Sequence, residues 1–286
     1  MKLKFLAIIV AVVIAGFTTA TCGNAQEMAS PAQVDTINVP ANAIESPMRC
    51  SIILPAKYFE ENDTTRYPVV YLLHGYDGDY SSWLKLTEPR LDSLATEYNM
   101  IFVCPDGRDS WYWDSPVVKN LQMETFITSE LVPYIDNNYR TIPCASKRAI
   151  TGFSMGGHGS MWLAMRHSDL FGSAGSMSGG LNINKPKWAK SWKMATRIGS
   201  QTEHPQRWID YTAITLISTL KPGQINLVID CGVDDFFIGV NREFHEELLK
   251  HKIPHDYTER PGRHTHPYWR NSLRHHLLYF HEIFNK

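Results

Sequence analysis

A serine flanked by glycines two positions before and two positions after it constrains this chain more than any other feature. The pattern is G-F-S-M-G at 152–156, where a predicted strand over 148–152 meets a predicted helix over 154–167. A sharp strand-to-helix turn lifts a serine hydroxyl above the end of a sheet, and the glycines let neighbouring backbone approach without a Cβ clash. The helix N-terminus stabilises negative charge beside it. The pattern therefore predicts that Ser154 is a nucleophile; the competing interpretation is a glycine-rich helix start with an idle serine.

Short apolar runs alternate with segments of helical spacing along most of the chain. The predicted strands are 48–54, 68–73, 100–104, 148–152, 171–177, 225–230 and 255–259, and the predicted helices are 91–98, 123–138, 154–167, 241–251 and 268–283. Continuous apolar strands that alternate with helices are typical of a mainly parallel sheet covered on both faces. No internal repeat or linker interrupts residues 34–286, so we expect one α/β domain there.

The segment 181–224 breaks this alternation. It is rich in lysine and carries Trp188 and Trp192 four positions apart. An insertion between two core strands usually lies over the carboxyl end of the sheet, where α/β proteins bind ligands. The alternative is a solvated amphipathic helix with both tryptophans packed inward.

The first 25 residues have the features of a signal peptide. A short basic start precedes an uninterrupted apolar run over 5–17, which is too short to span a bilayer, and small residues follow. Cleavage after Ala20 or Ala25 would leave a mature exported chain with no membrane span. Two alternatives stay open: a retained membrane anchor, and a lipid anchor on Cys22.

Charge and cysteine content exclude other classes of protein. The chain has 28 basic and 29 acidic residues and no basic run, which argues against a nucleic-acid partner. Four cysteines follow Cys22, and we expect them to be mostly free and buried: Cys50, Cys104, Cys144 and Cys231. No CxxC pair or Cys/His spacing indicates zinc, so we predict no metal.

A serine nucleophile needs a base, and the base needs a carboxylate that orients it. Asp234 and Asp235 follow the sixth predicted strand, and His264 and His266 follow the seventh. This is the order Ser, Asp, His, and loops after parallel strands meet at one edge of a sheet. Only one aspartate can orient the base and only one histidine can be the base. The spacing does not decide between Asp234 and Asp235 or between His264 and His266. A metal site at the two histidines would lack a nearby third ligand.

Two backbone N–H groups are needed to stabilise an oxyanion. Met155, directly after the predicted nucleophile, would supply one. The loop that follows the predicted strand over 68–73 would supply the other, through the N–H of Tyr76.

Three consecutive aromatic residues follow the predicted strand over 100–104. Trp111, Tyr112 and Trp113 stand among charged residues in a loop expected on the ligand side of the sheet. Exposing such large rings is costly unless they stack against a ligand. We therefore predict Trp111 and Trp113 as substrate-binding residues; the alternative is that they anchor the loop in the core.

Five motifs together resemble the putative-esterase family. They are H-G-Y-x-G at 74–78, P-D-G-R-D-S-W-Y-W-D-S-P at 105–116, G-F-S-M-G-G-H-G at 152–159, C-G-V-D-D-F at 231–236 and H-T-H-P-Y-W at 264–269. The family groups feruloyl and acetyl-xylan esterases of carbohydrate esterase family one, tributyrin-type esterases, S-formylglutathione hydrolase and mycolyl transferases. The resemblance spans about 34–286. It implies an α/β-hydrolase fold, Asp235 as the acid and His264 as the base. His266 stands where many members carry an aromatic residue.

The resemblance and the predicted signal peptide imply an exported serine esterase. The expected partner is a small ester or an acylated oligosaccharide, specifically acetyl or feruloyl esters of plant polysaccharide, and no cofactor is needed. A thioesterase acting on S-formylglutathione and a sugar acyltransferase are the alternatives within the family. A non-catalytic sugar-binding module is the alternative outside it, and the complete set of Ser, His and Asp candidates argues against that.

Overall fold

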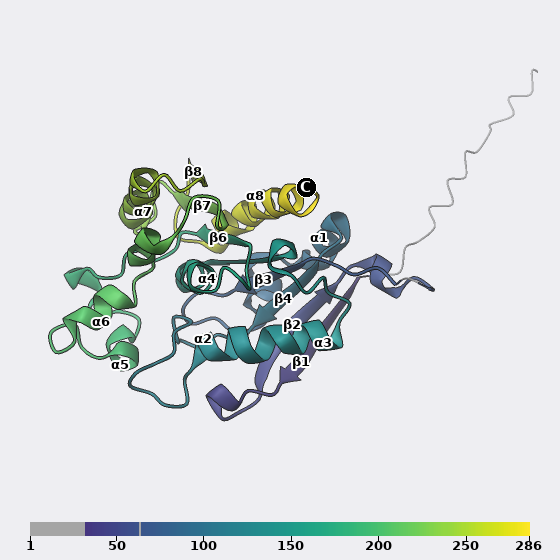
Figure 1. Ribbon diagram of the computed structural model, residues 1–286, viewed down its shortest axis with the longest axis horizontal. Helices are drawn as coiled ribbons and strands as arrows, with labels where there is room; N and C mark the ends of the chain where they lie inside the picture. The colour runs from purple at the N-terminus through teal and green to yellow at the C-terminus, as the bar shows by residue number, and fades with distance from the viewer. Residues whose placement is uncertain (1–31, 63) are drawn as a thin grey trace, which may run out of the picture.

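Eight strands form one sheet in the order β1-β2-β4-β3-β5-β6-β7-β8, as the computed structural model shows for residues 32–62 and 64–286 (Figure 1). The first two pairings, β1 with β2 and β2 with β4, are antiparallel, and every later pairing is parallel. The strands are β1 Gln33–Val39, β2 Met48–Leu54, β3 Val69–Leu73, β4 Ile101–Pro105, β5 Arg148–Phe153, β6 Ser173–Met177, β7 Asn226–Gly232 and β8 Asp256–Arg260. The predicted α/β class with a mainly parallel sheet is confirmed.

Seven of these strands coincide with predicted ones, and β1 does not. Its sequence, Q-V-D-T-I-N-V, has no continuous apolar run, and most of its residues are exposed because it pairs with one neighbour at the edge of the sheet. An edge strand needs no buried apolar surface on both faces, so β1 shows no apolar run in the sequence. Strand β8, at the other edge, also has no fully buried residue, but it coincides with a predicted strand.

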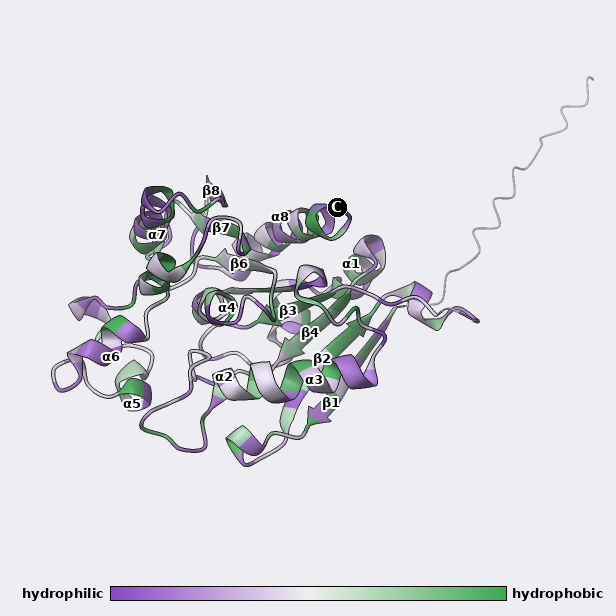
Figure 2. Cartoon of the chain, viewed as in Figure 1, coloured by the Kyte–Doolittle hydropathy of each residue, from purple (hydrophilic) through white to green (hydrophobic). Residues whose placement is uncertain are grey.

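Helices cover both faces of the sheet. Helices α1 Leu91–Tyr98 and α8 His266–Phe284 pack on one face, where they share a core with β3, β4 and β5. The other face carries α4 Met155–Arg166, α7 Ile238–Lys250 and one helical stretch composed of α2 Met123–Thr125, η4 Phe126–Leu131 and α3 Val132–Asn138. The central strands are mostly apolar, whereas the helices combine polar and apolar residues (Figure 2), as expected for a sheet buried between two helical layers.

The parallel pairing brings four loops to the same edge of the sheet. Leu73 pairs with Gly152 near the end of β3 and β5, and Asp230 pairs with Thr258 near the end of β7 and β8. The segments that follow these strands are the ones singled out by their sequence, and they therefore start from neighbouring positions.

The predicted insertion contains four short helices instead of one amphipathic helix. They are η6 Pro186–Trp188, α5 Met194–Ile198, α6 Pro205–Asp210 and η7 Ala213–Thr219. Figure 1 shows α5 and α6 grouped at one end of the molecule, away from α1 and the start of β1. Trp188 is buried, whereas Trp192 between η6 and α5 is half-buried.

The cysteines behave largely as expected. Cys50, Cys104 and Cys231 are buried free thiols, and Cys144 is a free thiol at the surface. None of the helices described within 32–62 and 64–286 is long and apolar enough to cross a membrane. The predicted signal peptide and the lipid site at Cys22 lie outside the described residues, and they stay predictions.

Candidate active site

Ser154 occupies a strained turn between β5 and α4. Its φ is 58° and its ψ is −118°, a combination that costs a non-glycine residue about 1–3 kcal/mol. The flanking glycines allow this turn because backbone packs against them. A Cβ on Gly152 would lie 2.6 Å from the carbonyl carbon of Gly156, and a Cβ on Gly156 would collide with the carbonyl oxygen of Leu73. The structure thus has the sharp strand-to-helix turn that the glycine spacing predicted.

The Ser154 side chain begins a chain of two hydrogen bonds. Its hydroxyl donates to Nε2 of His264 over 2.8 Å, and Nδ1–H of His264 donates to Oδ2 of Asp235, also over 2.8 Å. Asp235 is 3% exposed, and its other oxygen accepts the backbone N–H of Phe237 at 2.8 Å. A carboxylate can only accept here, so the imidazole carries its proton on Nδ1 and leaves Nε2 free to take one from the serine.

Backbone hydrogen bonds join the loop that carries Asp235 to the loop that carries His264. Val233 N–H donates to the carbonyl of Arg260, and Asp234 N–H donates to the carbonyl of Gly262 at 3.0 Å. The carboxylate and the imidazole therefore approach each other from a connected pair of loops, which favours a stable geometry for their hydrogen bond.

Asp234 and His266, the other candidates for the acid and the base, make no hydrogen bond in this chain of contacts. The Asp234 side chain is exposed, next to the buried Asp235. Nδ1 of His266 is hydrogen-bonded to the hydroxyl of Thr87 at 2.9 Å, and burial lowers the pKa of His266. His266 begins α8 and lines the pocket beside the serine without contacting its hydroxyl.

The loop after β3 is held close to Ser154. A Cβ on Gly75 would lie 3.3 Å from Cβ of Ser154, so the loop backbone passes directly beside the serine. His74 is buried and fixes this loop: its Nδ1–H donates to the carbonyl of Gly75, and its Nε2 accepts the N–H of Gly107, each at 2.7 Å. Within the described residues, no acceptor is bonded to the N–H of Tyr76, the next residue. Sequence reasoning did not identify His74 as the support of this loop.

The first N–H of α4 belongs to Met155, which is buried directly after the serine. An N–H at this position has no partner within its own helix. Tyr76 thus lines the same pocket as Ser154, and Met155 follows Ser154 directly at the start of α4. That their N–H groups stabilise an oxyanion stays a prediction.

An open pocket of about 430 Å³ surrounds the serine. Two stacked pairs of rings line it. Phe153 stacks on Trp269 with centroids 4.3 Å apart, and both are nearly fully buried. Trp192 stacks on the half-exposed Phe236. The complete lining is Gly75, Tyr76, Asp77, Gly78, Ser82, Leu86, Phe153, Ser154, Trp192, Phe236, His264, His266 and Trp269. In the part of the chain that the structure describes, no three His, Cys, Asp or Glu side chains cluster as metal ligands would.

The prediction that Trp111 and Trp113 bind substrate is wrong. They are 1% and 0% exposed, stack on each other at 5.5 Å and do not line the pocket. Left-handed backbone at Trp111 and Tyr112, with φ of 59° and 62°, turns the loop toward α4. There Gly159 leaves room for the Tyr112 ring. The alternative, that these rings anchor their loop in the core, is the correct interpretation.

Trp192 lines the pocket, where the sequence had predicted Trp111 and Trp113. It comes from the insertion over 181–224, so the expectation that this insertion reaches the ligand side of the sheet is confirmed. Its spacing from Trp188 was the available signal, although the sequence did not distinguish the ring at the pocket from the buried one.

Trp113→Ala is expected to lower stability more than it changes substrate binding. Removing a fully buried tryptophan from a stack costs about 3–5 kcal/mol of unfolding free energy. Urea denaturation should show this loss, while the Kd of a ligand bound in the pocket around Ser154 stays within about twofold. A large rise in Kd with unchanged stability would contradict the core assignment.

Comparisons with known proteins identify the sequence family to which most of the chain is similar. The sequence model of the family described as "Putative esterase" matches residues 41–280. A protein named as an esterase from Mycobacterium tuberculosis strain H37Rv is 30% identical over 241 residues, which are 75% of this chain and 52% of that protein. The chain thus spans about half the length of that relative. A protein named acetyl esterase from Caldicellulosiruptor saccharolyticus is 27% identical over 226 residues, covering 75% of this chain and 84% of that protein.

Solved structures show the same fold. A ferulic acid esterase superposes with a TM-score of 0.76 at 26% identity, covering 89% of this chain and 99% of that one. An S-formylglutathione hydrolase from Staphylococcus aureus has a TM-score of 0.75 at 19% identity, covering 88% and 100%. The latter likeness concerns the fold alone. The predicted α/β-hydrolase fold is confirmed.

Proposed function

The chain belongs to the putative esterase family, and on that premise we propose that it is an ester hydrolase that forms an acyl-enzyme on Ser154. The observation that supports this proposal is the chain of hydrogen bonds from Ser154 through His264 to the buried Asp235. A nucleophile, a base with the correct tautomer and an orienting carboxylate are the parts that acyl transfer requires.

The proposed reaction has two halves. Ser154 Oγ attacks the ester carbonyl while His264 Nε2 takes its proton, and the N–H groups of Tyr76 and Met155 hold the oxyanion. Collapse of this intermediate breaks the bond to the alcohol, which takes the proton back from His264. Water then attacks the acyl-enzyme by the same route, which releases the acid and restores the serine. Asp235 holds the imidazole in place and stabilises its charged form in each half.

We propose acetyl or feruloyl esters of plant polysaccharide as the substrates. Two relatives at 26% and 27% identity carry the names ferulic acid esterase and acetyl esterase. The pocket is bounded by flat aromatic rings at Trp192 and Phe236, and such surfaces suit a sugar ring or an aryl group. The predicted signal peptide over 1–25 supports an exported enzyme, for which an external polymer is the accessible substrate.

A panel of esters tests the substrate class. We expect kcat/KM for acetylated xylo-oligosaccharide or methyl ferulate to exceed that for a long-chain nitrophenyl ester by about tenfold or more, because flat rings such as Trp192 and Phe236 suit a sugar or an aryl group better than a flexible alkyl chain. A preference for long acyl chains would exclude the polysaccharide assignment and leave the esterase one intact. Faster cleavage of S-formylglutathione would favour the thioesterase alternative, and an acylated sugar product formed with added acceptor would favour the acyltransferase.

A further inference from the structure

The aromatic wall formed by Trp192 and Phe236 includes the most exposed aromatic ring of the pocket lining. The two rings stack with centroids 6.0 Å apart and planes 17° apart. Phe236 is 52% exposed, whereas Phe153 and Trp269, which line the same pocket, are only 3% and 5% exposed. A ligand group that continues into a polymer must extend into solvent, so this wall is suited to the polymeric part of an ester.

The wall also adjoins the group that must protonate the leaving alcohol. The ring of Phe236 lies 4.3 Å from the imidazole of His264, nearer than the rings of Trp269 at 4.9 Å or Phe237 at 5.5 Å. In the proposed reaction the alcohol oxygen must come within hydrogen-bond distance of Nε2 of His264. The alcohol portion of the ester therefore leaves the reaction centre next to this wall.

The backbone that presents Trp192 is strained. Trp192 and Lys193 both have left-handed φ values, 48° and 53°. The loop that faces them has the same feature at Trp111 and Tyr112. Two consecutive non-glycine residues in this region persist only where surrounding contacts hold them, and such strain is concentrated at functional sites.

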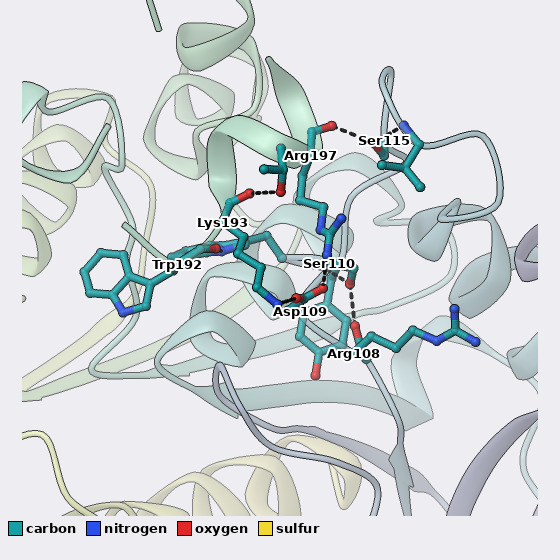
Figure 3. A network of polar contacts seen from close by, with 12 residues as sticks. Arg108, Asp109, Ser110, Ser115, Trp192, Lys193 and Arg197 are labelled. Atoms are coloured by element: carbon teal, nitrogen blue, oxygen red, sulfur yellow. Dashed lines mark hydrogen bonds and ion pairs between the residues drawn. The ribbon is translucent and has the colours of Figure 1, made fainter. Parts of the chain in front are cut away.

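Asp109 supplies those contacts. Its Oδ2 accepts the ammonium of Lys193 at 3.0 Å, and its Oδ1 accepts Nη2 of Arg197 at 2.5 Å (Figure 3). The indole N–H of Trp111 adds a bond to the carbonyl of Trp192 at 3.3 Å. One carboxylate thus joins the residue after Trp192 and the following helix to the loop after β4.

The two ion pairs differ in their surroundings. The side chain of Lys193 is 61% exposed, whereas those of Arg197 and Asp109 are 18% and 21% exposed. Water screens the first pair more than the second, so Arg197 contributes the firmer contact. Burial acts to raise the pKa of Asp109, but hydrogen bonds from Lys193 and Arg197 outweigh it and lower that pKa, which keeps the carboxylate charged.

We propose that Asp109, by holding Lys193 and Arg197, positions Trp192 as the wall against which the alcohol portion of the ester stacks. Asp109 does not line the pocket, so it is a positioning residue. Trp192, which does line it, is the specificity-determining residue. This inference rests on the proposed function, because it assigns one side of that pocket to the leaving alcohol.

Three variants and three esters test it. The variants are Trp192→Ala, Asp109→Asn and the matched control Asp114→Asn. Asp114 is a carboxylate of the same loop that bonds to Thr125 and does not line the pocket. Methyl acetate and acetylated xylo-oligosaccharide share the acyl group and differ in the alcohol, which has no ring in the first and is a sugar in the second. Methyl ferulate has a small alcohol and a large acyl group.

We expect KM for the acetylated oligosaccharide to rise about tenfold in Trp192→Ala and about threefold in Asp109→Asn, which is the scale of one aromatic stack. The rise for methyl acetate and for methyl ferulate, whose alcohol portion is a methyl group, should be much smaller, and kcat should change little. Asp114→Asn should leave all three KM values unchanged. A rise that follows methyl ferulate instead would place the acyl group at the wall and overturn the proposal.

The double variant shows whether Asp109 acts through Trp192. If it does, adding Asp109→Asn to Trp192→Ala causes no further rise in KM, because residues in one contact chain are not additive. Additive effects would overturn the positioning role. If Asp109→Asn fails to fold, Lys193→Met provides a milder test at the exposed pair. A wild-type enzyme that cleaves none of the esters would refute the proposed function, whereas cleavage without these KM changes would refute this inference alone.

Discussion

Ser154→Ala is expected to lower kcat for ester hydrolysis by about 10⁴- to 10⁶-fold while leaving KM and the fold nearly unchanged. The proposed covalent step needs the hydroxyl that donates to His264 at 2.8 Å, and alanine removes it. Alanine also fits the elbow no worse than serine, since both have a Cβ at a φ of 58°. What remains of the rate would come from substrate binding and from the N–H groups of Tyr76 and Met155.

Covalent labelling checks the same prediction independently of turnover. A fluorophosphonate probe should modify Ser154 in the wild-type protein, as peptide mass spectrometry would show, and should leave the alanine variant unlabelled. The control is thermal unfolding of both proteins, which should coincide within a few degrees. Retained activity with labelling at another serine would refute the assignment of the nucleophile.

The central fold could be predicted because most strands are buried on both faces. Strands such as β3 and β4 each consist of five buried residues, which appear in the sequence as continuous apolar runs. The same reasoning could not find β1, whose residues are mostly exposed at the edge of the sheet. Between the two edges predictability thus followed burial, whereas β8, at the other edge, has no fully buried residue and was still predicted.

The positions around the serine could be predicted because they lie directly after strands. Gly75, Ser154 and Asp235 each follow a strand of a parallel sheet, and the order of the chain therefore determines their shared location. The support of the loop after β3 by His74 could not be predicted, since its bond to Gly107 joins residues 33 positions apart.

The aromatic wall needed tertiary information. Trp111 and Trp192 both occur in polar loops on the ligand side of the sheet, and composition does not distinguish them. Whether each ring is buried or lines the pocket depends on the left-handed backbone in both loops and on the space that Gly159 leaves for Tyr112. Where a loop turns decides which ring is buried, and local propensity carries little information on that turn.

Substitution of Asp235 or His264 is expected to cause the second large loss of activity, and the neighbouring Asp234 and His266 provide the matched controls. Asp235→Asn is expected to lower kcat by about 10⁴-fold, because an amide at this position disturbs the tautomer of His264 and no longer stabilises its charged form. His264→Ala should cost about 10⁴- to 10⁶-fold, since it removes the group that transfers the proton. The structure motivates both through the 2.8 Å bonds on either side of the imidazole.

The partner positions serve as controls for these losses. The Asp234 side chain is exposed, and the hydrogen bond from this residue to Gly262 comes from its backbone N–H. Because Asp234→Asn keeps that bond, kcat should stay within about threefold. His266→Ala removes a bond to Thr87 and part of the pocket lining, so KM should change more than kcat. Steady-state kinetics on nitrophenyl acetate would measure all four. If Asp234→Asn proved more damaging than Asp235→Asn, the acid would be the exposed neighbour, and the observed hydrogen bond from His264 to Asp235 would have no catalytic role.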